Sequence, residues 1–109
     1  MADVLGSFEQ SVLLAVIRLR DEAYGSAIVT ELHKRLQRDV TVGAVHATLV
    51  RLENKGLLCS HLGEGTPIRA GRPRRYYKVE PKGVRALDEA RKAFSDLWRG
   101  IRLPIRRTI

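Results

Sequence analysis

Four arginines in a short stretch of the chain suit contact with phosphate groups. These are Arg69, Arg72, Arg74 and Arg75. Residues 69–78 contain no acidic side chain, and neither do residues 99–107. A cationic region attracts phosphate backbones or anionic membrane surfaces, and a narrow A-tract minor groove attracts guanidinium groups. From charge alone, an alternative interpretation is that the basic residues form a solvated surface that only maintains solubility.

A second set of side chains, in residues 41–56, suits close approach to a large partner. Three- and four-residue spacings place apolar residues on one face of a helix, and these are Val42, Val45, Leu49 and Leu52. Thr41 is a predicted N-cap and Gly56 a predicted helix end. The opposite face is small and almost uncharged in its first two turns, and it holds Gly43, Ala44, His46, Ala47, Val50 and Arg51. We interpret it as a face that lies against duplex DNA.

The residue types that carry catalysis or bind metals are present but do not form a set. His33, His46 and His61 have no partners at metal-ligand spacing. Cys59 would share a strand face with His61, but two ligands do not make a metal site. The sequence has no glycine-rich phosphate loop after a strand. We therefore predict no metal, no cofactor and no enzymatic activity.

The first element that must position these residues is a helix from Ser7 to about Arg20. Ser7 would cap it, with Gln10 completing a capping box. The segment up to Arg20 is apolar around nearly its whole circumference, and such a helix must be covered on both sides. In so small a domain, one side should pack on the domain itself and the other against a second subunit.

A second helix follows the tripeptide at residues 24–26 and runs to about Gln37. Only residues 38–41 separate it from the helix predicted in residues 41–56. Two short amphipathic helices joined by a tight turn form a helix-turn-helix, whose second helix reads DNA. The DNA contacts predicted on the reading helix are Thr41, Gly43, Ala44, His46, Ala47 and Arg51.

A β-hairpin is predicted after the reading helix. Residues 57–62 are a strand-length apolar run, residues 63–73 are rich in glycine and proline, and residues 74–79 alternate polar with aromatic and β-branched side chains. Three helices followed by a hairpin with a long basic tip is the order of a winged helix. Residues 1–80 are therefore the predicted DNA-binding domain, and its wing contacts are Arg69, Arg72, Arg74 and Arg75.

The last predicted helix runs from Pro81 to about Arg102 and is stopped by Pro104. Its length of about 33 Å exceeds what so small a core can cover. We therefore predict a dimerisation helix at residues 81–103, followed by a basic tail at residues 104–109. The predicted dimer interface combines the first and last helices, with Val12, Val16, Leu87, Phe94, Leu97, Trp98 and Ile101. The predicted fold class is mainly α with a small β-hairpin (α+β).

Composition and charge agree with one folded domain that has a basic second half. The chain has 109 residues, of which 44% are hydrophobic and 29% charged, enough for one modest core. Of its net charge of +8, residues 1–37 contribute little, whereas residues 38–80 hold eight basic against four acidic side chains. A single cysteine excludes an internal disulfide. Without a signal peptide or an apolar run long enough for a membrane, we expect a cytoplasmic protein.

From about residue 5 to residue 98 the chain resembles the PadR-like winged-helix transcriptional regulators. The matching pieces are Tyr24-Gly25, Gly43-Ala44, Arg51-Leu52-Glu53 followed by Gly56-Leu57, Arg74-Arg75-Tyr76-Tyr77, and Gly83. The short single C-terminal helix is similar to the compact branch of the family. The resemblance implies a homodimer that binds an operator palindrome in double-stranded DNA, usually as a repressor. In some compact members the last helix also forms a pocket for a small planar apolar effector, which would involve Phe94 and Trp98 here.

The chain departs from the family pattern at two places. The family usually has Leu-Tyr-Pro where this chain has Val45-His46-Ala47, so the operator sequence cannot be carried over. The family also usually has an aromatic residue at the position of Ser26, which together with Tyr24 is a predicted DNA contact of the second helix. The rival interpretation is a winged-helix module for protein–protein contact. Binding to random duplex DNA at low salt distinguishes the two.

Overall fold

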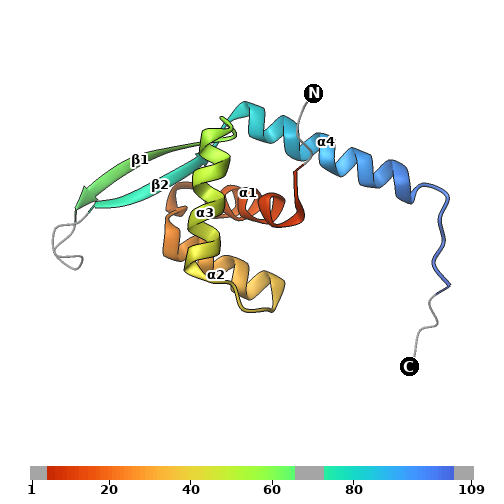
Figure 1. Ribbon diagram of the computed structural model, residues 1–109, viewed down its shortest axis with the longest axis horizontal. Helices are drawn as coiled ribbons and strands as arrows, with labels where there is room; N and C mark the ends of the chain where they lie inside the picture. Colours follow the sequence, from red (N-terminus) through yellow and green to blue (C-terminus); the bar gives the residue numbers. More distant parts are fainter. Residues whose placement is uncertain (1–4, 66–72, 105–109) are drawn as a thin grey trace.

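Three helices pack around one another, and a β-hairpin and a fourth helix extend from them on opposite sides (Figure 1). The computed structural model describes residues 5–65 and 73–104. Its elements in chain order are α1 (Ser7–Leu19), the 3-10 turn η1 (Arg20–Glu22), α2 (Gly25–Leu36), α3 (Val42–Asn54), β1 (Leu58–Gly65), β2 (Pro73–Val79) and α4 (Pro81–Trp98). This order confirms the predicted α+β class and the winged helix-turn-helix.

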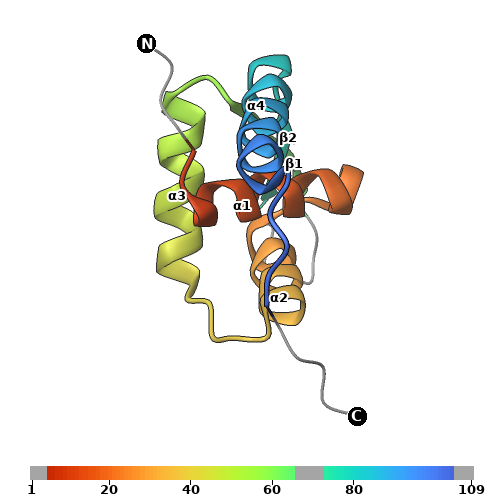
Figure 2. The same ribbon diagram turned by 90° about the vertical axis from the view of Figure 1, so that its right-hand side faces the viewer.

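The core lies where α1 meets α2, α3 and the base of the hairpin. Its buried side chains are Leu5, Val12, Leu13, Ala15, Val16, Ala23, Ile28, Leu32, Val45, Leu49, Leu52, Leu57, Leu58 and Tyr77. When the molecule is turned by 90°, α3 forms one of its sides, and one face of α3 therefore points away from all other elements (Figure 2). Among the described helices, none combines the length and the apolar character that a membrane crossing requires.

The start of α1 differs from the prediction. Gly6, in an extended conformation, is the N-cap, and its N–H donates to Glu9 Oε1 at 3.0 Å. The predicted cap Ser7 is already helical, and Gln10 donates from Nε2 to the carbonyl oxygen of Leu5 instead. The prediction was wrong by one residue because Glu9 sits at the third helical position of the box and can reach back to the capping N–H.

The hairpin is longer than its sequence pattern predicts. β1 and β2 pair antiparallel, with Leu58 opposite Val79, and the register shifts between Leu62 and Gly65. The prediction ended β1 at Leu62 because Gly63 read as a loop residue. In the structure, Gly63 makes room instead, since a Cβ there would lie 2.5 Å from the ring of Tyr76.

The base of the hairpin is hydrogen-bonded to the turn between α1 and α2. The Tyr77 N–H donates to the carbonyl oxygen of Ala23 at 2.8 Å, and Tyr24 forms an isolated antiparallel bridge with Tyr76. Residues 23–24 therefore act as a short third strand beside β2. Because a two-stranded hairpin alone is marginally stable in water, this contact and the burial of Tyr77 hold the wing on the helical core.

The junction between the wing and α4 is tight. The Leu57 carbonyl oxygen accepts a hydrogen bond from the Glu80 N–H at 2.9 Å. Gly83, in the first turn of α4, packs directly on that carbonyl group, and any Cβ at Gly83 would collide with the oxygen. A glycine is therefore required for α4 to start where it does.

α4 is shorter than predicted and projects away from the core. It ends at Trp98, and Gly100 follows with a φ of 81°, a backbone conformation that glycine adopts readily and that ends helices. The predicted end at Arg102 is therefore wrong, and Ile101 lies beyond the helix. At 18 residues, α4 is about 27 Å long. Every residue from 91 to 100 is exposed.

Candidate nucleic-acid interface

The N-terminus of α3 is built as predicted. The Thr41 side chain accepts a hydrogen bond from the Ala44 N–H at 3.0 Å, and the Thr41 carbonyl oxygen accepts from Val45 N–H at 3.2 Å. The cap uses the Thr41 Oγ1 as an acceptor, so its hydroxyl proton stays available for donation. Gly56 has a φ of 76° just after the helix, which confirms the predicted stop.

The two faces of α3 divide as predicted, with one exception. Val45, Leu49 and Leu52 are buried, and on the opposite side Gly43, Ala44, His46, Ala47 and Val50 are exposed. Val42, predicted to be part of the buried stripe, is 69% exposed. It is the first helical residue, and it borders an open hollow instead of packing in the core. We call Val42, Gly43, His46, Ala47 and Val50 the outer face of α3.

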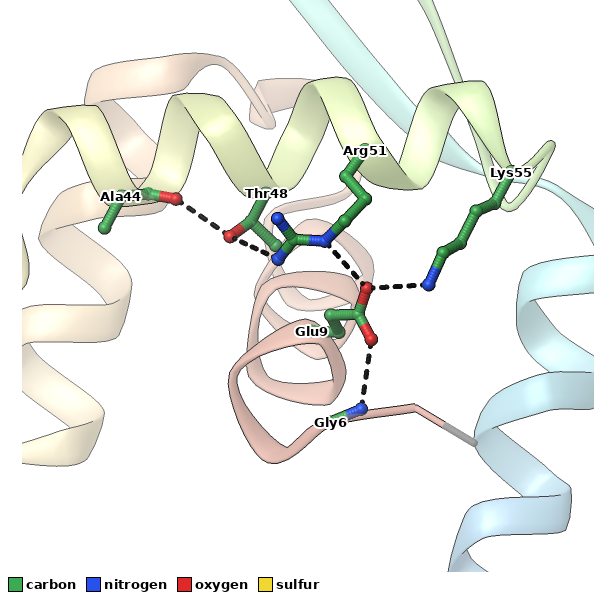
Figure 3. Close-up of polar contacts among 6 residues, drawn as sticks. All are labelled: Gly6, Glu9, Ala44, Thr48, Arg51 and Lys55. Atoms are coloured by element: carbon green, nitrogen blue, oxygen red, sulfur yellow. Dashed lines mark hydrogen bonds and ion pairs between the residues drawn. The ribbon is translucent and has the colours of Figure 1, made fainter. Parts of the chain in front are cut away.

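Arg51 does not point away from the protein as the other predicted contacts do. Its Nε donates to Glu9 Oε2 at 3.1 Å, and the Lys55 Nζ donates to the same oxygen at 3.1 Å (Figure 3). Thr48, about one turn before Arg51 on α3, donates to the Ala44 carbonyl oxygen at 2.8 Å. Glu9 thus connects α3 to the start of α1 through these two hydrogen bonds. DNA contact by Arg51 stays a prediction.

The carboxylate of Glu9 is buried but remains charged. Burial raises its pKa, yet the hydrogen bonds from the Gly6 N–H, Lys55 and Arg51 together hold the pKa below its ordinary value. A buried carboxylate with three donors and two cationic neighbours is satisfied as an anion. Sequence reasoning missed Glu9 and Lys55, because only the packing of α1 on α3 brings the two together.

The wing arginines in the described residues are held by different partners. The Arg74 guanidinium lies over the ring of Tyr24, 4.1 Å from its centroid, and Arg74 Nε is buried without a hydrogen-bond partner. Arg75 donates to Ser60 Oγ at 2.9 Å, and Ser60 donates to Glu53. A stacked guanidinium keeps its charge and most of its N–H groups for a further acceptor. Arg69 and Arg72 lie outside the described residues.

A hollow of about 340 Å³ joins the predicted contacts of three elements. It lies between the start of α2, the edge of α3 and β2. Its polar lining includes Tyr24, Ser26, His46, Arg74 and Arg75. These residues were predicted as DNA contacts from separate parts of the sequence, and the fold brings them to one concave surface beside the outer face of α3.

The histidines and the cysteine do not form a metal site in the described residues. His61 stacks on Tyr76, with ring centroids 5.8 Å apart. The pKa of the Cys59 thiol is raised by its hydrogen bond with Glu80 and by burial. A thiol kept protonated is a poor metal ligand and a poor nucleophile.

Two residues of the predicted dimer interface are wrongly placed. Val12 and Val16 are 0% and 2% exposed within a single chain, so they have no surface left for a partner. On α1 the exposed apolar side chains are instead Leu14 and Ile17. Of the predicted α4 residues, Leu87 packs against the core, and the exposed ones are Phe94, Leu97, Trp98 and, beyond the helix, Ile101.

A helix-turn-helix followed by a two-stranded wing defines the winged-helix class of proteins, and the comparisons with known proteins then identify the family. Residues 13–89 match the family described as "Transcriptional regulator PadR-like family". The transcriptional regulator Rv3488 of Mycobacterium tuberculosis is 37% identical over 81 residues, which cover 74% of this chain and 71% of that protein. The chain belongs to the PadR-like family of transcriptional regulators.

Solved structures agree with this assignment. A PadR-like transcription factor from Bacteroides fragilis is 32% identical with a TM-score of 0.67, covering 83% of this chain and 82% of that one. A PadR family transcriptional regulator from Eggerthella lenta is 31% identical with a TM-score of 0.66, covering 82% and 75%. The family resemblance predicted from the sequence is confirmed, and the family is one of regulators and not of enzymes.

Proposed function

We propose that this protein binds operator DNA in the cytoplasm as a homodimer and represses the promoters that it occupies. Residues 1–80 supply the DNA-binding domain, and residues 81–103, which contain α4 (Pro81–Trp98), supply the dimerisation segment. The observation that carries the proposal is the outer face of α3, exposed and free of acidic side chains, with Arg74 and Arg75 on the hollow beside it. No bulky side chain at Gly43 or Ala47 keeps the helix backbone away from a groove.

In this proposal α3 enters the major groove with its N-terminal turns foremost. The Thr41 hydroxyl and the His46 imidazole donate to, or accept from, base edges or phosphates. Arg74 and Arg75 contact phosphates or the adjacent minor groove, as do Arg69 and Arg72. The start of α2, with Tyr24 and Ser26, faces the same backbone strand, where a helix N-terminus favours anions. Phosphate contacts of this kind position the protein and add affinity without reading sequence.

The dimer proposal is supported by the apolar surface of α4. Phe94, Leu97 and Trp98 are 59%, 67% and 53% exposed, and large apolar side chains exposed together are typical of an interaction site. Leu14 and Ile17 of α1 add to the available apolar surface. A two-fold dimer presents two copies of α3 to successive turns of one groove, about 34 Å apart, which a palindromic operator matches.

Duplex binding by the unaltered protein tests the proposal most directly. We expect fluorescence anisotropy to detect binding to random-sequence duplex at low salt, with affinity that falls as salt rises. Arg74→Ala and Arg75→Ala should each reduce the salt slope by up to about one unit. Arg91→Ala, which removes the same charge from exposed α4, should leave the slope unchanged. A module for protein–protein contact predicts no duplex binding at low salt.

A planar apolar effector that releases the repressor is the finer part of the proposal. Phe94 and Trp98 are four residues apart, so they lie on one exposed face of α4, and a dimer would bring a second such pair close by. Trp98 is the only tryptophan in the chain, so its fluorescence reports directly on this face. We expect saturable quenching by flat aromatic compounds that also weaken DNA binding. Quenching without an effect on DNA binding would contradict an effector role.

A further inference from the structure

The outer face of α3 lacks the side chains that read guanine or adenine. Arg and Lys bind guanine through its O6 and N7, and Asn and Gln bind adenine through its N6 and N7. Within α3 the charged residues are Arg51 and Glu53. Arg51 is bonded to Glu9, and Glu53 accepts from Ser60 at 2.7 Å. Asn54 is the last helical residue, far from the N-terminal turns that reach base edges in this class.

What the outer face does present is methyl groups. Ala47 and Val50 follow Gly43 at helical spacings of four and three, so the three residues share one line along the helix. Val42 and Val50 are 69% and 44% exposed. An apolar side chain in the major groove makes its specific contact with the C5-methyl group of thymine, because the other base edges there are donors and acceptors.

The charges around this face favour a duplex as its occupant. Arg74 and Arg75 line the hollow on one flank of this face, and none of the described residues that line that hollow is acidic. On the other flank the exposed Arg38 is followed by the exposed Asp39. An apolar protein surface would gain nothing from the cations of the hollow, whereas the phosphate backbone beside a groove is complementary to them. An apolar strip beside a basic hollow matches thymine methyl groups beside a phosphate strand.

We propose that Val42, Ala47 and Val50 read thymine methyl groups, so that each operator half-site is rich in A·T pairs. The inference rests on the proposed DNA binding and adds the class of sequence that is bound. Sequence choice comes from methyl contacts on the outer face, with His46 as the polar reader. A G·C pair is disfavoured where these residues contact the groove, because it offers them no methyl group.

Deoxyuridine substitution tests this proposal, because uracil lacks only the methyl group of thymine. A duplex chosen from random DNA by its tight binding is prepared with uracil in place of thymine, one position at a time. Each contacted methyl group should change the dissociation constant by about fourfold. Symmetric substitution in both half-sites should give roughly 16-fold. Substitution outside the half-sites is the control on the DNA and should have no effect.

Matched protein variants assign the effect to particular residues. Val50→Ala and Val42→Ala remove exposed methyl groups without opening the core, and each should reduce the preference for thymine over uracil at one position. Val84→Ala removes an exposed valine from α4, 51% exposed, and should keep the full preference. Circular dichroism of each variant confirms that the helices are retained.

Three results overturn the inference, and they are distinguishable. Equal affinity for thymine and uracil duplexes at every half-site position refutes methyl reading but leaves DNA binding intact. If the half-sites selected from random DNA are rich in G·C pairs, methyl reading is likewise refuted while DNA binding stays intact. Absence of binding to any duplex at low salt refutes both this inference and the proposed function.

Discussion

Replacing Glu9 by glutamine removes the charge that joins α1 to α3 and keeps the shape of the side chain. Glutamine can still accept from the Gly6 N–H, but it presents N–H groups where Arg51 and Lys55 need an acceptor. Each hydrogen bond to a charged group contributes about 1.5–3 kcal/mol. The exposure of Arg51 and Lys55, 51% and 30%, reduces both contributions through solvent screening. We expect Glu9→Gln to lower the free energy of unfolding by about 2 kcal/mol, roughly 10 °C in Tm.

The loss should depend on pH because only the carboxylate binds the two cations. The pKa of Glu9 lies below its ordinary value of 4.5, since the hydrogen bonds it accepts outweigh the opposing effect of burial. A group with a lowered folded-state pKa stabilises the fold above its unfolded-state pKa, and this contribution is lost as pH falls through the folded-state value. The difference between the two proteins should be complete at neutral pH and shrink below pH 4.5.

Urea unfolding at matched protein concentration measures this difference, because the proposed dimerisation would make midpoints concentration-dependent. Asp88→Asn is the matched control. Asp88 also contacts two cations, Arg91 and Lys92, but on the solvent-exposed surface of α4, and its loss should not shift the midpoint measurably. Equal stability of Glu9→Gln and the unaltered protein would refute the argument. A difference that persists undiminished at pH 3 would refute the role given to the charge.

Three further perturbations test other parts of the structure. Gly43→Ala should stabilise the free protein by about 0.5–1 kcal/mol through helix propensity, since nothing lies within 4 Å of a Cβ added at this position. The same substitution should weaken DNA binding several-fold, because the methyl group would separate the helix from the groove. An unchanged affinity would show that the groove does not contact Gly43. Gly83→Ala should lower the free energy of unfolding by about 1–3 kcal/mol, as overpacking does, because its Cβ meets a backbone carbonyl; urea unfolding shows the loss. Leu97→Glu with Trp98→Glu should give monomers in analytical ultracentrifugation, and a surviving dimer would exclude the α4 surface.

Local signals predict α3 well because they act over a few residues. Thr41 and Gly56 mark its ends, and its buried stripe follows from helical spacing. Gly100 carries a similar stop signal for α4, and the predicted end at Arg102 overlooked it. Val42 shows the limit of spacing, since the period places a residue on a face but does not say how far the neighbouring element extends along it.

Contacts between distant segments are what spacing cannot predict. The bonds from Arg51 and Lys55 to Glu9 span 42 and 46 positions, and several other acidic residues were equally available in the sequence. Val12 and Val16 are likewise buried by segments that lie far from them in the sequence, so their burial could not be predicted from spacing. A helix apolar on all sides must be covered, but the sequence does not say which side the domain covers and which side is left for a partner.

The hydrogen bond between Tyr77 and Ala23 anchors the wing to the helical core at a point close to the basic side chains of the wing. Arg74 is three residues from Tyr77, about 10 Å along a strand. A tilt of the hairpin by about 10° around this point would move Arg74 by only about 2 Å over that strand length. The spacing between Arg74 and α3 is therefore fixed in the free protein. Any adjustment on binding should then be made by the duplex. Operators whose groove width already matches this spacing, or whose base steps deform easily, should bind more tightly than stiff operators with the same contacts.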